Sequence, residues 1–218
     1  MNIKDIKQNI IGVCRYLEEK EFVVGTWGNV SVRLGERIIL TPSRIGYDVM
    51  TADDLVTVDL EGNIIEGKHT PTSEKEVHRL IYRSREDVGA IIHCHSLYAT
   101  AAACSGSERI PPLMEEMSQL LGGEIPVTKS YIPAEQHHAL GLEAAAAIAD
   151  KNAVLLKNHG PVCCGRDLSE ALLVCKTAEK ACSIFLSLSR DTAPVEIGDK
   201  FVQSERYRYL YKYGKEKT

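Results

Sequence analysis

Apolar residues recur along the chain in two periods, which predict helices and strands in alternation. Near the start, apolar residues repeat at helical spacing and predict a helix over residues 3–20; they are Ile3, Ile6, Ile10, Cys14 and Leu17. The next segment, 25-GTWGNVSVR-33, leads from a glycine-bearing turn into a strand in which apolar and polar residues alternate. The chain therefore opens with a helix followed by a strand.

The same two periods predict the remaining elements. Strands are expected at 37–42, at 55–65 with a turn at 61–63, at 88–94, near 125–127 and at 153–157. Helices are expected at 73–85, 96–104, 136–149 and 167–189. Ser73 and Glu76 form a capping-box pattern, which predicts that the second helix begins at Ser73.

This alternation favours one α/β or α+β domain with a central sheet, spanning residues 1–218. No low-complexity linker or internal repeat divides the chain. From about residue 201 the pattern is lost, and we expect a mobile C-terminal tail there. That tail carries tyrosines at positions 207, 209, 211 and 213.

Composition narrows the class of protein. The 44% hydrophobic and 26% charged residues are typical of a soluble globular protein. A net charge of -4 does not indicate binding to nucleic acid or to an anionic membrane. The N-terminal pattern is amphipathic rather than a signal peptide, and no apolar run approaches the ~20 residues that span a bilayer. Seven cysteines without C-x-x-C spacing favour a reduced, cytoplasmic setting.

Three histidines lie at the ends of predicted strands. His93 and His95 are two residues apart, so both side chains point to one face of an extended chain, and His159 follows the strand at 153–157. Glu74 lies in the first turn of the helix expected at Ser73. If the strand ends meet, three imidazoles and a carboxylate provide a set of ligands that zinc uses in proteins. The alternative is a group of solvated or hydrogen-bonded histidines, which the residues alone do not exclude.

The remaining histidines and the cysteines suggest no further site. We interpret four histidines as ordinary ones; they are His69, His78, His137 and His138. The cysteines are interpreted as small buried apolar residues, because Cys175 and Cys182 are seven residues apart on one helical stripe. Cys163 and Cys164 suggest no redox site, since adjacent cysteines rarely form a bridge.

Five motifs together resemble one family. They are 25-GTWGNVSVR-33, 41-TPS-43, 71-PTSEKEVH-78, 91-IIHCHS-96 and 158-NHGPVCCG-165. In this order and spacing they resemble the class II aldolase/adducin family, and within it the enzymes similar to fuculose-1-phosphate aldolase. The resemblance implies an α/β fold of three layers, with a central and mostly antiparallel sheet flanked by helices. It also implies a homotetramer with sites between subunits.

The resemblance also implies the metal and the catalytic group. The histidines matching His93, His95 and His159 bind one divalent metal per subunit, expected to be zinc with manganese, cobalt or iron as alternatives. The glutamate matching Glu74 is both a metal neighbour and the acid/base. Such a metal can chelate and stabilise the charge left on dihydroxyacetone phosphate when a ketose 1-phosphate is cleaved.

The substrate phosphate is expected near hydroxyls, amides and helix N-termini, which offer hydrogen-bond donors. Family members use the positions matching Thr26, Asn29, Thr72 and Ser73 for this purpose. Ser43 and Arg44 are also interpreted as phosphate neighbours, although Arg44 stands where relatives often have glycine.

Two further residues are nominated near the substrate aldehyde. The pair 213–214 matches a tyrosine-glycine pair that closes over the site and donates a proton, which nominates Tyr213. Glu116 stands at about the position of a second tyrosine from the neighbouring subunit, and dehydratase relatives use a glutamate from this region. The departure at Glu116 leaves the aldehyde half of the substrate open.

The predicted function is a metal-dependent aldolase that acts on a phosphorylated sugar of the fuculose, ribulose or 5-deoxypentulose type. An epimerase, a methylthioribulose 1-phosphate dehydratase or a sugar-acid phosphate decarboxylase on the same scaffold is the alternative. An adducin-like binding module, with or without a structural zinc, ranks last, because adducin-type domains lack the metal histidines. No nucleic acid or membrane partner is expected.

Overall fold

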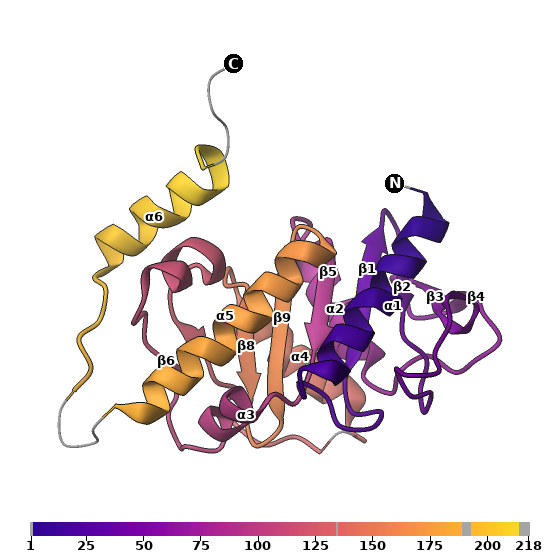
Figure 1. Cartoon of the computed structure of the whole chain (residues 1–218), viewed down its shortest axis with the longest axis horizontal. Coiled ribbons are helices and arrows are strands. Elements are labelled where there is room, and N and C mark those ends of the chain that lie inside the picture. The colour runs from indigo at the N-terminus through magenta and orange to yellow at the C-terminus, as the bar shows by residue number, and fades with distance from the viewer. Residues whose placement is uncertain (1, 134, 189–192, 214–218) are drawn as a thin grey trace.

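The computed structural model describes residues 2–133, 135–188 and 193–213. Its centre is a seven-stranded sheet in which all neighbouring strands are antiparallel (Figure 1). The strands lie in the order β4 (Ile64–Glu66), β3 (Val56–Asp59), β2 (Arg37–Leu40), β1 (Asn29–Leu34), β5 (Ala90–His93), β9 (Gly160–Gly165) and β8 (Ala153–Leu156). A separate two-stranded sheet pairs β6 (Arg109–Ile110) with β7 (Ile125–Pro126).

Helices cover both faces of the central sheet. One face packs against α1 (Ile3–Glu19), α3 (Leu97–Ala103) and α5 (Leu168–Ser187) through one cluster of buried apolar side chains. The other face packs against α2 (Lys75–Ser84) and α4 (His137–Ile148) through a second cluster. These three layers confirm the predicted α/β fold with a mostly antiparallel sheet. No helix among the described residues has the length and apolar character to cross a membrane.

The start of α2 differs from the prediction. The helix begins at Lys75, and Glu74 is the residue before its first turn, so the capping box from Ser73 is wrong. The Glu76 side chain bonds Arg79 instead of reaching back to Ser73, because a guanidinium on the next turn is the stronger partner for a carboxylate. Consequently Ser73 and Glu74 lie in the connection that enters the helix, where both face a cleft.

Of the elements that were not predicted, the two longest are a strand and a helix. Strand β9 contains Pro161 and lies between two glycines, a composition that reads as loop, yet it pairs with both β5 and β8. Helix α6 (Asp199–Tyr211) occupies the segment in which we expected a tail without regular structure. Its Val202 alone is buried, and it packs against a π-helical turn at Met117–Leu121. In Figure 1 this helix stands apart from the layered body.

Candidate metal centre

The antiparallel pairing of β5 with β9 brings the three histidines together. His93 is the last residue of β5, and His159 stands in the turn just before β9. Because β5 and β9 are antiparallel, both histidines lie at the same end of the two strands. His95 follows β5 in the connection to α3. Glu74 stands just before α2, in the helical layer on one face of the sheet, and its carboxylate contacts His93 and His159 at this end of the strands. In Figure 1 this end of the sheet is the lower one, where α3 lies.

The side chains converge on one point. The Nε2 atoms of His93 and His95 are 3.2 Å apart, and the three imidazole rings meet edge to face with centroids 4.8–5.1 Å apart. Glu74 Oε2 lies 3.3 Å from His93 Nε2, and Glu74 Oε1 lies 3.2 Å from His159 Nε2. Among the described residues, these histidines form the one cluster of three His, Cys, Asp or Glu side chains close enough to share a metal.

These separations fit a divalent metal. Ligand atoms at ~2.0–2.1 Å around a tetrahedral zinc are about 3.3 Å from one another, which matches the three contacts of 3.2–3.3 Å. His93 Nδ1 donates to the carbonyl oxygen of Pro161 over 2.9 Å, which leaves the Nε2 lone pair facing the centre. The imidazoles and the carboxylate therefore form a donor set that suits such an ion.

Burial sets the protonation of the cluster. It lowers the pKa of His93 to about 4, against the opposing effect of the Glu74 carboxylate, and it lowers the pKa of His95 as well. Burial would raise the pKa of Glu74, but contacts with His93, His159 and Asn29 hold that pKa well below its usual value. At pH 7 the two imidazoles are neutral and the carboxylate is ionised, which are the forms that bind a metal.

Two glycines make this approach of backbone and ligands possible. A Cβ on Gly160 would lie 2.4 Å from the Cys94 carbonyl oxygen and 3.1 Å from Cδ2 of His95. Gly28 has a φ of +149°, and its Cβ would lie 2.5 Å from a methyl of Val23. Gly160 is therefore required by the close approach of the Cys94 backbone and the His95 ring, and Gly28 by its backbone conformation.

A cleft of about 390 Å³ opens beside the cluster. An isolated bridge between Pro42 and Pro71 brings the segments 41–44 and 70–74 together along its wall. All six residues nominated for the phosphate line this cleft, together with Glu74, His95 and His159; the six are Thr26, Asn29, Ser43, Arg44, Thr72 and Ser73. Arg44 has a φ of +63°, a left-handed conformation that is unfavourable for most residues other than glycine.

Two nominated residues lie elsewhere. Tyr213 stacks on Tyr209 with ring centroids 6.3 Å apart, and the Tyr209 hydroxyl donates to Glu170 at 2.9 Å, near the end of β9. His159 precedes the start of that strand, whose six residues span roughly 17–20 Å. Tyr213 is thus remote from the histidines of its own chain. Glu116 is exposed, pairs with Lys180 at 3.2 Å and does not line the cleft.

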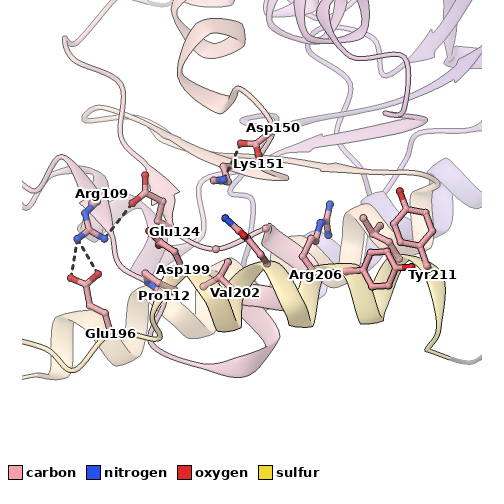
Figure 2. A pocket seen from close by; sticks show the side chains of 15 residues that line it. Arg109, Pro112, Glu124, Asp150, Lys151, Glu196, Asp199, Val202, Arg206 and Tyr211 are labelled. Atoms are coloured by element: carbon pink, nitrogen blue, oxygen red, sulfur yellow. Dashed lines mark hydrogen bonds and ion pairs between the residues drawn. The ribbon is translucent and has the colours of Figure 1, made fainter.

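A larger cleft of about 890 Å³ lies between α6 and the body (Figure 2). Its arginine and lysine side chains bond acidic groups or backbone carbonyls: Arg109 pairs with Glu124 and Glu196, and Lys151 pairs with Asp150. Its Arg206 bonds two backbone carbonyls of the π-helical turn. Its volume exceeds that of the histidine cleft, yet among the residues that the structure describes no set of metal ligands converges there.

The sequence analysis missed two residues near the site. Trp27 lines the cleft and is 65% exposed, but from its motif we nominated only Thr26 and Asn29. His78, interpreted as ordinary, bonds Asn29, which bonds Glu74 in turn. Its spacing of four residues from Glu74, one helical turn, was the available signal.

Comparisons with known proteins agree with this geometry. Residues 8–186 match the family model described as "Class II Aldolase and Adducin N-terminal domain". The chain is 39% identical to an L-fuculose phosphate aldolase from Methanocaldococcus jannaschii, over 83% of this chain and 95% of that protein.

Solved structures are similar as well. An L-fuculose 1-phosphate aldolase superposes with a TM-score of 0.88 and 29% identity, covering 95% of this chain and 97% of the other. The L-fuculose-1-phosphate aldolase from Thermus thermophilus gives a TM-score of 0.72 at 29% identity, covering 85% and 95%. The family match ends at residue 186, before α6 begins.

Proposed function

Because the chain belongs to the class II aldolase and adducin family, we infer that it is a class II aldolase, a lyase that cleaves a ketose 1-phosphate to dihydroxyacetone phosphate and an aldehyde. The observation that carries this function is the convergence of three imidazoles and Glu74 beside a cleft lined with hydroxyl, amide and guanidinium groups. Relatives named L-fuculose phosphate aldolase support a fuculose-type substrate, and ribulose and 5-deoxypentulose 1-phosphates remain candidates.

We propose that His93, His95 and His159, with Glu74 as a neighbour, hold one divalent metal per subunit, and that this metal is zinc. When bound, it would act as a Lewis acid toward the carbonyl and hydroxyl oxygens of the substrate. Three imidazoles leave coordination positions open for those oxygens, which a closed four-ligand cage would not. The separations of 3.2–3.3 Å support this assignment.

We propose that Glu74 is the acid/base. Breaking the bond between C3 and C4 leaves negative charge on the dihydroxyacetone phosphate half. In the direction of condensation, the ionised Glu74 removes a proton from C3 of dihydroxyacetone phosphate, and the aldehyde oxygen gains a proton as the C3–C4 bond forms. In cleavage, the C4 hydroxyl loses a proton as that bond breaks, and Glu74, once it has received this proton, delivers it to C3. Its low pKa keeps it ionised between turnovers, and its contacts with His93 and His159 support a role next to the metal-bound substrate.

We propose that the opposite wall of the cleft binds the phosphate. Thr26, Ser43, Thr72 and Ser73 offer hydroxyls there, and Arg44 adds a positive charge. Asn29 is restricted, because its Oδ1 contacts His78 and one hydrogen of its NH2 group is donated to Glu74. One N–H of this side chain is left for the phosphate.

We propose that the working form is a cytoplasmic homotetramer with sites between subunits. Tyr213 is remote from the histidines of its own chain, so its nominated role as proton donor to the aldehyde oxygen requires a neighbouring subunit. Within each single domain of residues 1–218, the segment from about 201 would move relative to the body, which its sparse packing supports. Glu116 would then face the aldehyde of a neighbouring site. Measuring the molar mass in solution tests the assembly.

The first experiment follows the release of dihydroxyacetone phosphate by a coupled assay. It uses metal-loaded protein, EDTA-treated protein and Glu74→Gln on fuculose, ribulose and 5-deoxyribulose 1-phosphates. We expect release by the loaded protein, loss after EDTA and a fall of about 10²–10⁴-fold in the variant. Intact, metal-loaded protein that releases none from any of the three would overturn the aldolase assignment, and products of water or carbon dioxide loss would identify a related reaction.

A further inference from the structure

A line of hydrogen-bonded side chains runs from Glu74 into the core between the sheet and α2. Asn29 Nδ2 donates to Glu74 Oε2 over 2.8 Å, and Asn29 Oδ1 contacts His78 Nε2. On the far side of the ring, His78 Nδ1 lies 2.7 Å from Ser31 Oγ, which lies 2.8 Å from the Tyr82 hydroxyl. All five side chains belong to buried residues.

Two secondary-structure periods build this line. Asn29 and Ser31 are two residues apart on β1 and point to the same face of the sheet. Glu74, His78 and Tyr82 recur every four residues and follow one side of α2. The polar line is therefore specified by the sequence at five positions, in a layer that is otherwise filled by apolar side chains.

The ionised carboxylate fixes the direction of every bond in the line. Glu74 can only accept, so the NH2 group of Asn29 faces it and Oδ1 faces His78. His78 Nε2 consequently carries the ring proton, and Nδ1 accepts the Ser31 hydroxyl, whose oxygen accepts from Tyr82. Burial lowers the pKa of His78 to about 3, so the ring is neutral at pH 7 and offers one donor and one acceptor.

Stability alone does not account for this arrangement. A buried polar network is at best comparable in stability to well-packed apolar side chains of the same volume, and each unpaired member would be costly. What the network adds is orientation. Without the His78 donor, the Asn29 amide could turn and present its oxygen to the Glu74 carboxylate.

We propose that His78 is a positioning residue for Glu74: its Nε2–H holds the Asn29 amide in the orientation that donates to Glu74 Oε2. The inference rests on the acid/base role proposed for Glu74. With Oε2 held by Asn29, Oε1 is the carboxylate oxygen that exchanges a proton with the substrate. His78 acts through Asn29 and touches neither substrate nor metal.

A matched pair of variants tests this role in the metal-loaded enzyme. His78→Gln places an amide nitrogen near the position of Nε2 and keeps a donor for Asn29. His78→Asn is one methylene shorter and reaches only the Nδ1 position, beside Ser31. The control is Ile81→Val, which removes a buried methyl from the same helix without touching a polar atom.

We expect the Asn variant to lose about 10–100-fold in kcat, with KM within about threefold of wild type and full metal content. The Gln variant should recover most of that loss, and the Ile81 variant should retain kcat. Equal losses in the Gln and Asn variants would overturn the proposal. A rise in KM at constant kcat would also overturn it, because His78 would then serve the phosphate through Asn29.

A second measurement needs neither variants nor turnover. Nitrogen-15 NMR of labelled histidines in the metal-loaded wild type reports the tautomer of His78, and we expect a proton on Nε2 at pH 7. A proton on Nδ1, or an imidazolium, would overturn the proposed orientation. If wild-type protein cleaves no ketose 1-phosphate, the aldolase function fails, while this spectrum still decides the arrangement around His78.

Discussion

The two clefts of this molecule differ in the residues that line them and in how those residues are paired. In the cleft under α6, of about 890 Å³, arginine and lysine side chains end on acidic partners or backbone carbonyls. Beside the cleft of about 390 Å³ at the other end of the sheet, the ligand nitrogens of three histidines face one another. The Nε2 atoms of His93 and His95 lie 3.2 Å apart, and a cation bound to both would take the place of a hydrogen bond between them.

The difference shows that unused bonding capacity identifies the site better than volume does. A group that already has its partner gains little from a ligand, because binding would only exchange one contact for another. Neutral imidazoles pointing at a common centre gain a full set of bonds when an ion arrives. Substitutions in the two clefts and changes of pH test this distinction.

The largest effect is expected from His159→Ala. Removing one of three imidazoles should abolish stoichiometric metal binding and lower the cleavage rate about 10³-fold, since several kcal/mol of charge stabilisation are lost. Metal content by mass spectrometry and the coupled assay measure both. Arg206→Met, in the other cleft, should leave metal content unchanged. If it removed the metal as well, the contrast between the clefts would be wrong.

Gly160→Ala should reduce metal affinity by about 10–100-fold, because the new methyl would displace the His95 ring or the Cys94 carbonyl. Titration with a chelating indicator measures this affinity. The matched change is Gly122→Ala beside α6, where φ is +84° but the nearest atom is 3.6 Å away. It should lower thermal stability and leave metal affinity intact. Equal metal affinity in the two variants would contradict the requirement at Gly160.

The metal-free protein should lose stability as pH falls below 6.5. The pKa of His78 is about 3 and that of His93 about 4 in the folded state, both below the unfolded value of 6.5. The unfolded chain therefore binds protons first. Each histidine should lower the free energy of unfolding by ~1.4 kcal/mol per pH unit between about pH 6 and 4.5. His78→Gln should remove the contribution of one histidine to this dependence of unfolding free energy on pH, which urea titrations at several pH values measure. An unchanged dependence would contradict burial of a neutral ring.

Arg44→Gly should have the smallest effect, and it should change both the free energy of unfolding and KM. Relief of the left-handed φ should raise the free energy of unfolding by up to ~1 kcal/mol. Loss of the exposed charge should raise KM for a ketose 1-phosphate about fivefold at unchanged kcat. Denaturant titrations and steady-state kinetics measure the two. A fall in stability without a change in KM would assign Arg44 a structural role.

The sequence predicted most of the sheet and the centre of the site. Strands such as β1 and β5 have uninterrupted apolar or alternating patterns, and the period places their side chains directly. The approach of His93 to His159 required only that two strand ends meet, and the antiparallel pairing of β5 and β9 supplies this. The family resemblance nominated the phosphate residues, and the structure gathers them in one cleft.

The remaining features depend on long-range contacts that no local pattern contains. β9 exists because β5 and β8 flank it, which overrides the preference of Pro161 for loops. α6 buries only Val202, so it lacks the apolar stripe by which a helix is recognised. The role of His78 depends on Asn29, which comes from a strand far earlier in the chain.

The placement of the histidines also gives the site a mechanical consequence. His95 and His159 delimit a loop that contains α3, the π-helical turn, the small sheet, α4 and β8. An ion bound to both would close this loop like a removable cross-link, and closing a loop of about 60 residues reduces the entropy of the unfolded chain by an amount worth ~4 kcal/mol. Chelation would then reverse the cross-link, and amides throughout that loop would exchange faster with solvent even where they lie far from the cleft.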